Sequence, residues 1–356
     1  MKRIVAIIIA AVMLLSLAAC GTSGSTTAPA AAATTSTENK EPAAAPAQEA
    51  AAEPESAPAA EDIKWPERPI EVIIPYGAGG DTDFNAGAYL EGLSKELGVN
   101  VIGTNLTGAG GTVASRQVKD AAPDGYQVLF FHSAINVNEV IGTADFGIHD
   151  FKLAGIAAMS PGEIITMRAD SGITNLQELY DYSKAHPGEL KIAMDTGTMV
   201  HVQSLMLQKA GFDIDLIDVG GASDRVAALA GGHCDIIINA YGTVKDYIEK
   251  GDFVAIAHTN ATRSEGYPDI PTAAEQGYDL TLLKHYFFAF PKDTPQEYVD
   301  KFAAACEKVA ATPEYAKNIM DAYRQTPFTA NAEDGLKYMD EFKAVVQSFV
   351  DELLGS

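Results

Sequence analysis

The 356-residue chain has few cysteines and few basic side chains. Its three cysteines form no CxxC pair and no His/Cys metal spacing, so a disulfide-rich scaffold and a structural zinc site are excluded, and no metal or cofactor is predicted. Cys234 and Cys306 are expected to be buried free thiols, with a disulfide between them as the alternative. Because 48 Asp and Glu outnumber 25 Lys and Arg, the net charge of −23 argues against nucleic acid and anionic membrane faces as partners.

Motifs of common enzymes are also missing. The sequence has no GxSxG elbow, no HExxH pair and no Walker loop, and Gly108-Ala-Gly-Gly-Thr-Val departs from GxGxxG at the last glycine. The chain is therefore predicted not to be an enzyme. An exported α/β enzyme that acts on a small carboxylate stays open as an alternative, with Asp81, Asp83 and His132 as its only candidate groups.

Apolar runs long enough to cross a membrane are absent. Lys2 and Arg3 precede a short apolar run (4–15), which is typical of a secretory signal. The run leads into Leu17-Ala-Ala-Cys20, which resembles a bacterial lipobox; an ordinary signal with an incidental cysteine is the alternative. We predict that residues 1–20 are a lipoprotein signal peptide and that Cys20 carries a lipid. The protein would then be exported and lipid-anchored to the outer face of the cytoplasmic membrane, at the cell surface or in the periplasm.

Large apolar side chains are almost missing from residues 21–62, which consist mainly of Ala, Thr, Pro and Glu. Such a segment cannot bury enough surface to offset the entropy lost on ordering. It is predicted to be a disordered linker between the lipid and the folded part.

From residue 63 onward, strand-like and helix-like stretches alternate, which predicts an α/β fold with mostly parallel sheets. In open α/β sheets, ligands bind where strand-to-helix loops meet at the carboxyl ends of the strands. Glycine lets backbone N–H groups approach an anion, and helix starts favour negative charge. A carboxylate held by about four or five N–H groups, without an arginine, is expected. The loops are 75–83, 105–112, 132–138, 195–201 and 219–224, with 239–243 as a sixth candidate.

Local signals also predict helix boundaries. Thr294 to Glu297 has the pattern of a capping box with proline at the first helical position. Ser223 or Asp224 is expected to cap the helix that follows the fifth loop, and Asn331 to cap one last helix that runs to about Leu354.

Three motifs in fixed order resemble a known family. They are Pro69-Ile-x-x-Ile-x-Pro-Tyr-x-x-Gly-Gly-x-x-Asp83, Asn105-x-x-Gly-Ala-Gly-Gly111 and Ala122-Pro-Asp-Gly-Tyr126. Together they resemble the Bug family, the extracytoplasmic solute receptors of tripartite tricarboxylate transporters, over about residues 64–354.

The resemblance implies a two-lobe fold of the type II periplasmic binding protein kind, with a ligand cleft between the lobes. Lobe 1 is expected to comprise 64–167 and 255–356, and lobe 2 to comprise 168–254. The implied function is the capture of a small carboxylated solute, a di- or tricarboxylate or related organic acid, for the membrane subunits of a transporter, by a monomer. A ligand sensor for a membrane signalling partner is a further alternative.

Two departures from the family pattern bear on the ligand. Asp81 adds a carboxylate beside Asp83, which would repel a second substrate carboxylate or pair with an amino or hydroxyl group. Gly220-Gly221 stands where the family has an aromatic residue. Ligand contacts are predicted at Tyr76, Gly79, Gly80, Asp81, Thr82, Asp83, Asn105, Gly108, Ala109, Gly110, Gly111, His132, Ser133, Thr196, Gly197, Thr198, His201, Gly220, Gly221, Ala222 and Asn239.

Overall fold

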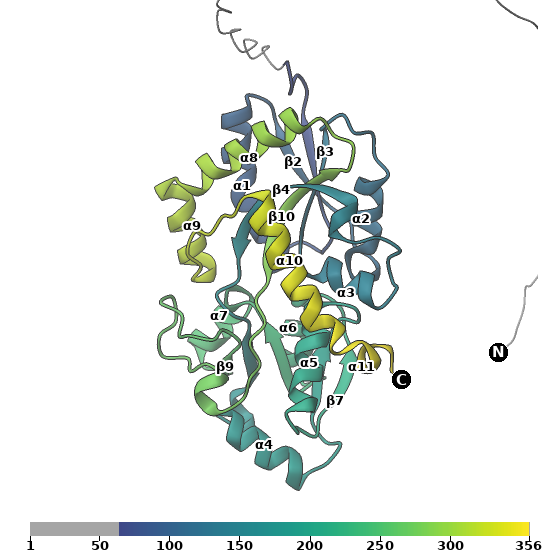
Figure 1. Cartoon of the computed structure of the whole chain (residues 1–356). Helices are drawn as coiled ribbons and strands as arrows, with labels where there is room; N and C mark the ends of the chain where they lie inside the picture. Colours follow the sequence, from purple (N-terminus) through teal and green to yellow (C-terminus); the bar gives the residue numbers. More distant parts are fainter. Residues whose placement is uncertain (1–63, 356) are drawn as a thin grey trace, which may run out of the picture. The chain divides into compact units, whose positions relative to one another are not determined.

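The computed structural model describes residues 64–355. They belong to one compact unit of the chain, Ala60–Ser356, and form two five-stranded sheets covered by helices (Figure 1). The predicted signal peptide, the lipidation site at Cys20 and the linker over 21–62 lie outside the described residues. Within the described part, no helix is long and apolar enough to cross a membrane.

The first sheet has the strand order β2-β1-β3-β10-β4. Its strands are β1 (Ile70–Ile74), β2 (Val101–Asn105), β3 (Gln127–His132), β4 (Phe151–Met159) and β10 (His285–Pro291). β1 pairs in parallel with β2 and β3, whereas β10 is antiparallel to both β3 and β4. Phe287 of β10 lies opposite Phe131 of β3, and both are fully buried in the core of this sheet.

The second sheet has the order β7-β6-β8-β5-β9. Its strands are β5 (Ile164–Arg168), β6 (Lys191–Met194), β7 (Asp215–Asp218), β8 (Ile236–Asn239) and β9 (Phe253–His258). β6 pairs in parallel with β7 and β8, and β5 is antiparallel to β8 and β9. The predicted α/β class is confirmed. Each sheet is mixed, because one strand runs against the other four.

The chain passes between the sheets twice, from β4 to β5 and from β9 to β10. The two connections meet where the backbone N–H of Ser160 donates to the carbonyl of Lys284 at 2.9 Å. The predicted lobe boundaries put most of β5 and part of β9 in lobe 1, whereas both strands pair in the second sheet. We therefore propose boundaries nearer to Ser160 and Lys284.

Helices cover both sheets. Their bounds are α1 Asp81–Leu97, α2 Thr112–Lys119, α3 Ala134–Val140, α4 Leu176–Ala185, α5 Met199–Lys209, α6 Ala222–Ala230, α7 Tyr241–Lys250, α8 Gln296–Ala310, α9 Pro313–Tyr323, α10 Ala332–Gln347 and α11 Val350–Leu354. α1 buries Ala86, Tyr89 and Leu93, spaced three and four apart, and ends at Gly98 in the left-handed conformation that glycine adopts without strain.

Three predicted helix boundaries differ from the structure. The capping box at Thr294–Glu297 is wrong, because Pro295 is the N-cap residue and the buried Thr294 hydroxyl has no partner. α6 begins at Ala222 and no side chain caps it, so Ser223 and Asp224 lie inside its first turn. Asn331 does cap α10, but this helix ends at Gln347.

The last two helices, α10 and α11, connect the elements around the first sheet to those around the second. α10 packs on β4 and α3, and α11 packs on α5 (Figure 1). Phe349, which lies between the two helices, is buried together with Val346, Leu353 and Met199 in one apolar cluster. The C-terminal segment therefore joins the first sheet's helices to those of the second.

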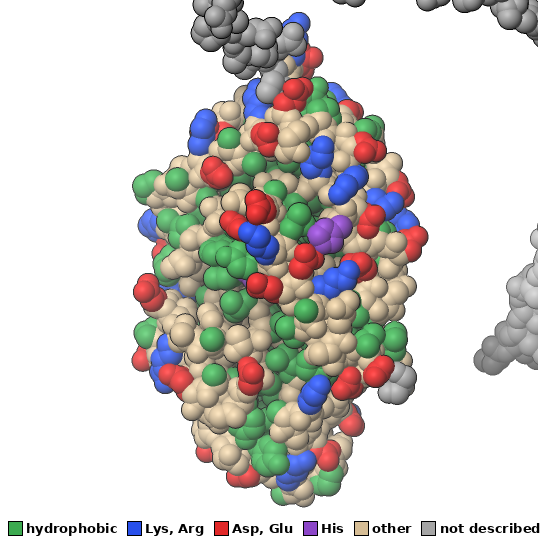
Figure 2. Space-filling view, viewed as in Figure 1, with side chains coloured by type: hydrophobic (Ala, Val, Ile, Leu, Met, Phe, Trp, Pro, Cys, Tyr) green, Lys and Arg blue, Asp and Glu red, His purple; other side chains and the backbone are tan. Residues whose placement is uncertain are grey.

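The two cysteines of the described part are buried free thiols, as expected. Acidic and basic side chains alternate over the face shown in Figure 2, so the acidic excess forms no continuous patch on this face. That distribution gives no electrostatic reason for a large charged partner there.

Candidate functional site

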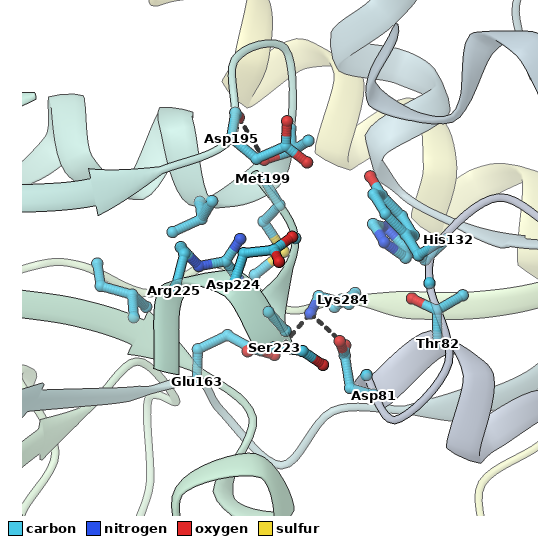
Figure 3. A pocket seen from close by; sticks show the side chains of 18 of the residues that line it. Asp81, Thr82, His132, Glu163, Asp195, Met199, Ser223, Asp224, Arg225 and Lys284 are labelled. Carbon is cyan, nitrogen blue, oxygen red and sulfur yellow. Dashed lines mark hydrogen bonds and ion pairs between the residues drawn. The ribbon is translucent and has the colours of Figure 1, made fainter. Parts of the chain in front are cut away.

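A cavity of about 160 Å³ lies between residues of the two sheets (Figure 3). An engineered cavity of about 150 Å³ holds benzene, so this one suits a molecule of similar size. The residues that line it are Tyr76, Gly77, Ala78, Gly80, Asp81, Thr82, His132, Glu163, Asp195, Thr198, Met199, Val200, Gln203, Gly221, Ala222, Ser223, Asp224, Arg225, Ile238 and Lys284.

Three helices start at this cavity. The N-cap residues of α1, α5 and α6 are Gly80, Thr198 and Gly221, all line the cavity or adjoin it, and no side chain caps any of these helices. The first backbone N–H groups of an α-helix have no intrahelical acceptor. Each helix start also carries roughly half a positive charge from the aligned peptide dipoles. The arrangement therefore offers several free N–H donors to an anion.

Side-chain hydrogen bonds hold the first loop next to the cavity. Asp83 accepts a hydrogen bond from the Gly79 N–H (2.9 Å) and another from the Asn105 amide (2.8 Å). The same amide donates to the Tyr76 carbonyl at 2.8 Å. Asp83 and Asn105 thus hold the turn before α1, while Gly80 and the first turn of α1 line the cavity.

Arg225 brings a guanidinium to the cavity from the first turn of α6. It is only 7% exposed. Its Nε donates to Asn239 Oδ1 (2.9 Å) and its Nη1 to the Gly220 carbonyl (2.8 Å). Burial lowers the pKa of Arg225, and Asp81, Asp195 and Glu163 oppose that shift. No partner is recorded for Nη2 in the described part of the chain. This nitrogen is the donor that an anionic ligand would meet.

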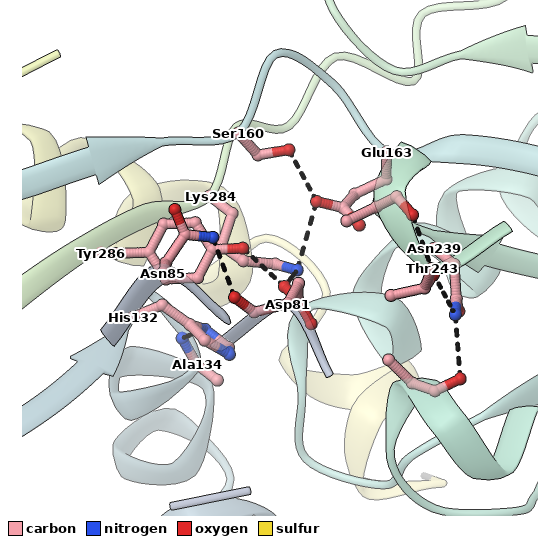
Figure 4. A network of polar contacts seen from close by, with 12 residues as sticks. Asp81, Asn85, His132, Ala134, Ser160, Glu163, Asn239, Thr243, Lys284 and Tyr286 are labelled. Carbon is pink, nitrogen blue, oxygen red and sulfur yellow. Dashed lines mark hydrogen bonds and ion pairs between the residues drawn. The ribbon is translucent and has the colours of Figure 1, made fainter. Parts of the chain in front are cut away.

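A buried ion network, formed by Asp81, Lys284 and Glu163, lies at the base of the cavity (Figure 4). Lys284 Nζ is 2.7 Å from Asp81 Oδ2 and 3.2 Å from Glu163 Oε1. Tyr286 donates to Asp81 (2.5 Å), and Ser160 donates to Glu163 (2.8 Å). Burial raises the pKa of Asp81. The charges of Lys284 and His132 and the hydrogen bonds from Lys284 and Tyr286 lower it by more, so the pKa lies below its ordinary value. Asp81 is therefore a paired anion.

The imidazole of His132 and the ring of Tyr76 stack at 5.4 Å between centroids and border the cavity. His132 Nδ1 accepts from the Ala134 N–H at 3.2 Å, so the proton of the neutral ring is on Nε2. Burial, together with Lys284 and Arg225, lowers the pKa of His132 to about 3. The ring is thus a neutral hydrogen-bond donor.

Asp195 is the other carboxylate of interest. Burial, Asp218 and Asp224 raise its pKa to about 6 and outweigh the opposing effect of Arg225. Its backbone carbonyl accepts from the Thr198 hydroxyl at 2.7 Å, but no hydrogen bond to its carboxylate is recorded in residues 64–355. Figure 3 shows this carboxylate near the cavity, on the loop before α5.

Comparison with known proteins places the chain in a family. The model of the tripartite tricarboxylate transporter family receptor matches residues 86–353. The chain belongs to this family. The UPF0065 protein in the gbd 5′ region of Cupriavidus necator is 29% identical to this receptor over 297 residues, which are 82% of this chain and 89% of that protein.

Solved structures agree with this assignment. The periplasmic binding protein BugD is 26% identical, with a TM-score of 0.69, and the match covers 82% of this receptor and 95% of BugD. A solved periplasmic transporter is 25% identical, with a TM-score of 0.76 and coverage of 81% and 98%. The resemblance to the Bug family and the periplasmic-binding-protein fold are confirmed.

In this receptor, the structure brings eight of the predicted contact residues to the cavity: Tyr76, Gly80, Asp81, Thr82, His132, Thr198, Gly221 and Ala222. The others lie around it. Gly79, Asp83 and Asn105 shape the first loop, and Asn239 and Gly220 hold Arg225. Ser133 accepts from the His285 N–H, and His201 from the Gly197 N–H.

The second glycine loop does not line the cavity. It lies beside the loop before α5, since a Cβ on Gly110 would be 3.4 Å from the carbonyl oxygen of Thr196. Asn138 donates to the Gly110 carbonyl at 2.9 Å. Ligand contacts at Gly108, Ala109, Gly110, Gly111, Thr196 and Gly197 stay a prediction.

The predicted contacts omitted five charged residues of the site, namely Glu163, Asp195, Asp224, Arg225 and Lys284, although Asp195 and Asp224 lie in predicted loops. One signal for Arg225 was available, because a cation in the first turn of a helix opposes the helix dipole and calls for a nearby anion. Lys284 also stands alone at the start of an apolar strand, where an unpaired lysine is costly. Nothing in the sequence joins Lys284 to Asp81, 203 residues earlier.

Proposed function

We propose that this receptor binds a small carboxylate in the cavity and delivers it to the membrane subunits of its transporter. The supporting observation is that three uncapped helix starts lie at the same cavity as Arg225, whose Nη2 has no recorded partner in residues 64–355. A hydrogen bond to a charged group contributes about 1.5–3 kcal/mol. Four or five of these contacts contribute about 6–15 kcal/mol before the cost of association, a range that includes the roughly 8 kcal/mol of micromolar binding.

Calorimetry with a panel of organic and amino acids tests this proposal. The variant Gly80→Val is the sharpest probe, because the Cβ at Gly80 has only Gly77 O (3.6 Å) and Ala222 Cβ (4.0 Å) near it, on the cavity side. We expect this variant to keep the fold and to lose binding. Gly87→Val is the matched control. Gly87 lies in α1, the helix that Gly80 precedes, and a Cβ at this position has no atom within 4 Å. The proposal would be overturned if the wild type and the control both failed to bind every acid of the panel.

We also propose that the receptor is not an enzyme. A base at the cavity would need a free carboxylate or imidazole close to a nucleophile. Asp83 is held by Gly79 and Asn105, Asp81 is paired with Lys284, and the pKa of His132 is lowered to about 3. Asp195 has a free carboxylate, but no hydroxyl or thiol in residues 64–355 is recorded in a hydrogen bond with that carboxylate, so a nucleophile that it could activate is lacking there. Incubation with each bound acid, followed by NMR, is expected to recover the acid unchanged.

Export and anchoring through a lipid on Cys20 are part of the proposal, as is a monomeric state. The support is the sequence pattern of residues 1–20 together with the periplasmic relatives. Cys20→Ser is expected to move the protein from the membrane fraction to the soluble exported fraction. Retention of the variant in the membrane would contradict the anchor. Adjacent genes for large and small membrane subunits would favour transport over sensing.

A further inference from the structure

An anion needs hydrogen-bond donors, but the cavity also holds several acceptors for which no donor is recorded in residues 64–355. Glu163 is 3% exposed, and its Oε1 is engaged by Ser160 and Lys284, but no partner is recorded for Oε2 in the described residues. Gln203 is 2% exposed, and its Oε1 is buried without any hydrogen bond. The carboxylate of Asp195, which is partly exposed, likewise has no recorded hydrogen bond in residues 64–355. A buried acceptor without a donor is costly, so Gln203 Oε1 points to a donor on the ligand, and Glu163 Oε2 and the Asp195 carboxylate can accept further ones.

The charges of the lining residues lead to the same conclusion. The carboxylates are Asp81, Glu163, Asp195 and Asp224, against the two cations Lys284 and Arg225. Lys284 is already paired with two of these carboxylates. Of these two cavity cations, only Arg225 has no carboxylate within ion-pair distance among the described residues. One ligand carboxylate therefore has a partner, whereas a second one would meet an excess of negative charge.

The free groups also lie on different sides of the cavity. The start of α1 and the Nε2 of His132 belong to the first sheet's layer, and Asp195 to a loop of the second. Figure 3 shows Asp195 and Arg225 on the side opposite Thr82 and His132. A ligand in this cavity of about 160 Å³ therefore meets the start of α1 on one side and both Arg225 and Asp195 on the other, so its anionic and cationic groups must lie close together.

We propose that the ligand is a small zwitterion with one carboxylate and one protonated amine, and that Asp195 accepts the amine. The carboxylate is held by Arg225 Nη2 and by the start of α1. Glu163 Oε2 and Gln203 Oε1 accept the remaining donors of the ligand. This inference rests on the proposed carboxylate binding and narrows it to one class of acid.

Matched sets of ligands test the inference. Calorimetry at pH 7.5 would compare alanine, lactate and propionate, which carry an amine, a hydroxyl or neither at the same carbon. Aspartate, malate and succinate repeat the comparison with a second carboxylate, which is expected to weaken the binding of all three. We expect the amino member to bind about tenfold or more tighter than the unsubstituted member, because an ammonium adds a charged hydrogen bond. Equal or tighter binding of malate and succinate, or of lactate and propionate, would overturn the zwitterion while leaving carboxylate binding intact. Absence of binding by every member would overturn carboxylate binding itself.

Variants of Asp195 assign the amine to its partner. Asp195→Asn keeps the size of the side chain and is expected to reduce the preference for the amino member to about one. Asp195→Glu keeps the charge and should retain a preference. Asp181→Asn is the control for loss of one negative charge, since Asp181 is exposed on α4 and its one recorded hydrogen bond among the described residues is with Gln177. An unchanged preference in Asp195→Asn would remove Asp195 from the amine site.

Discussion

Lys284→Met should destabilise the folded receptor because it breaks the buried ion network. The lysine is 7% exposed and lies 2.7 Å from Asp81 and 3.2 Å from Glu163. Methionine has a similar shape but leaves both carboxylates buried without a counter-charge. Removal of one partner from a buried pair costs about 3–5 kcal/mol.

That loss converts into a shift of the melting temperature. Unfolding entropy is about 2.1 cal/mol/K per residue, so roughly 290 folded residues give about 0.6 kcal/mol/K. The expected fall is therefore about 5–8 °C at pH 7.5, measured by differential scanning calorimetry. Lys95→Met is the matched control, because Lys95 pairs with Glu91 on the exposed face of α1. The control is expected to melt within about 1 °C of the wild type.

The pH dependence gives the test its sign. In the wild type the pKa of Asp81 lies below its ordinary value, so its contribution to stability is present above the ordinary value and is lost in stronger acid. In Lys284→Met the burial that raises this pKa is no longer opposed by Lys284. The penalty is then greatest at pH 7.5 and shrinks as the pH falls toward 4.5. The reasoning would be refuted if Lys284→Met melted at the same temperature as the wild type at pH 7.5, or if its melting temperature fell by more at pH 4.5 than at pH 7.5.

Three further predictions concern the cavity and its surroundings. Arg225→Gln is expected to weaken binding of every carboxylate by about tenfold to a hundredfold in calorimetry, with an unchanged circular dichroism spectrum; unchanged affinity would contradict its role. Burial and the neighbouring Asp218 and Asp224 raise the pKa of Asp195 to about 6, so Asp195 gains its negative charge as the pH rises from 5.5 to 7.5. Over this range propionate should bind more weakly and alanine more tightly. If both affinities changed in the same direction, Asp195 would not be the partner of the amine. Gly111→Ala puts a Cβ 2.4 Å from Phe131 Cζ at φ +97°, so chemical denaturation should show a loss of about 1–3 kcal/mol; wild-type stability would show that the ring can move.

Local pattern was enough to predict the α/β class and the loops at the cavity. Strand, glycine and helix start follow one another within a few residues at 75–83 and at 219–224, so each loop can be recognised without knowing its neighbours. The direction of β10 could not be read in that way. Its partners in the sheet, β3 and β4, precede it by more than a hundred residues, and nothing in an apolar strand specifies its direction.

The charged groups of the cavity show a second limit. Asp81 was predicted as an additional carboxylate beside the ligand, which would repel a second substrate carboxylate or pair with an amino or hydroxyl group. Its charge is balanced by Lys284, which arrives from the second connection between the sheets. Whether a charged residue acts on a ligand depends on such partners, and they are fixed only by the tertiary fold. A sequence pattern therefore located the site better than it predicted the site's electrostatics.

The apolar cluster around Phe349 has a thermodynamic consequence for ligand entry. If the two sheets separate to admit a ligand, α11 and Phe349 must leave either α5 or the rest of the cluster, which exposes apolar side chains to water. Exposure of apolar surface raises heat capacity, and its burial lowers heat capacity. Ligand binding would then carry a negative heat-capacity change larger than a small polar acid can produce by its own burial. The enthalpy of binding would become more exothermic with rising temperature, and the C-terminal helices would be the source of that slope.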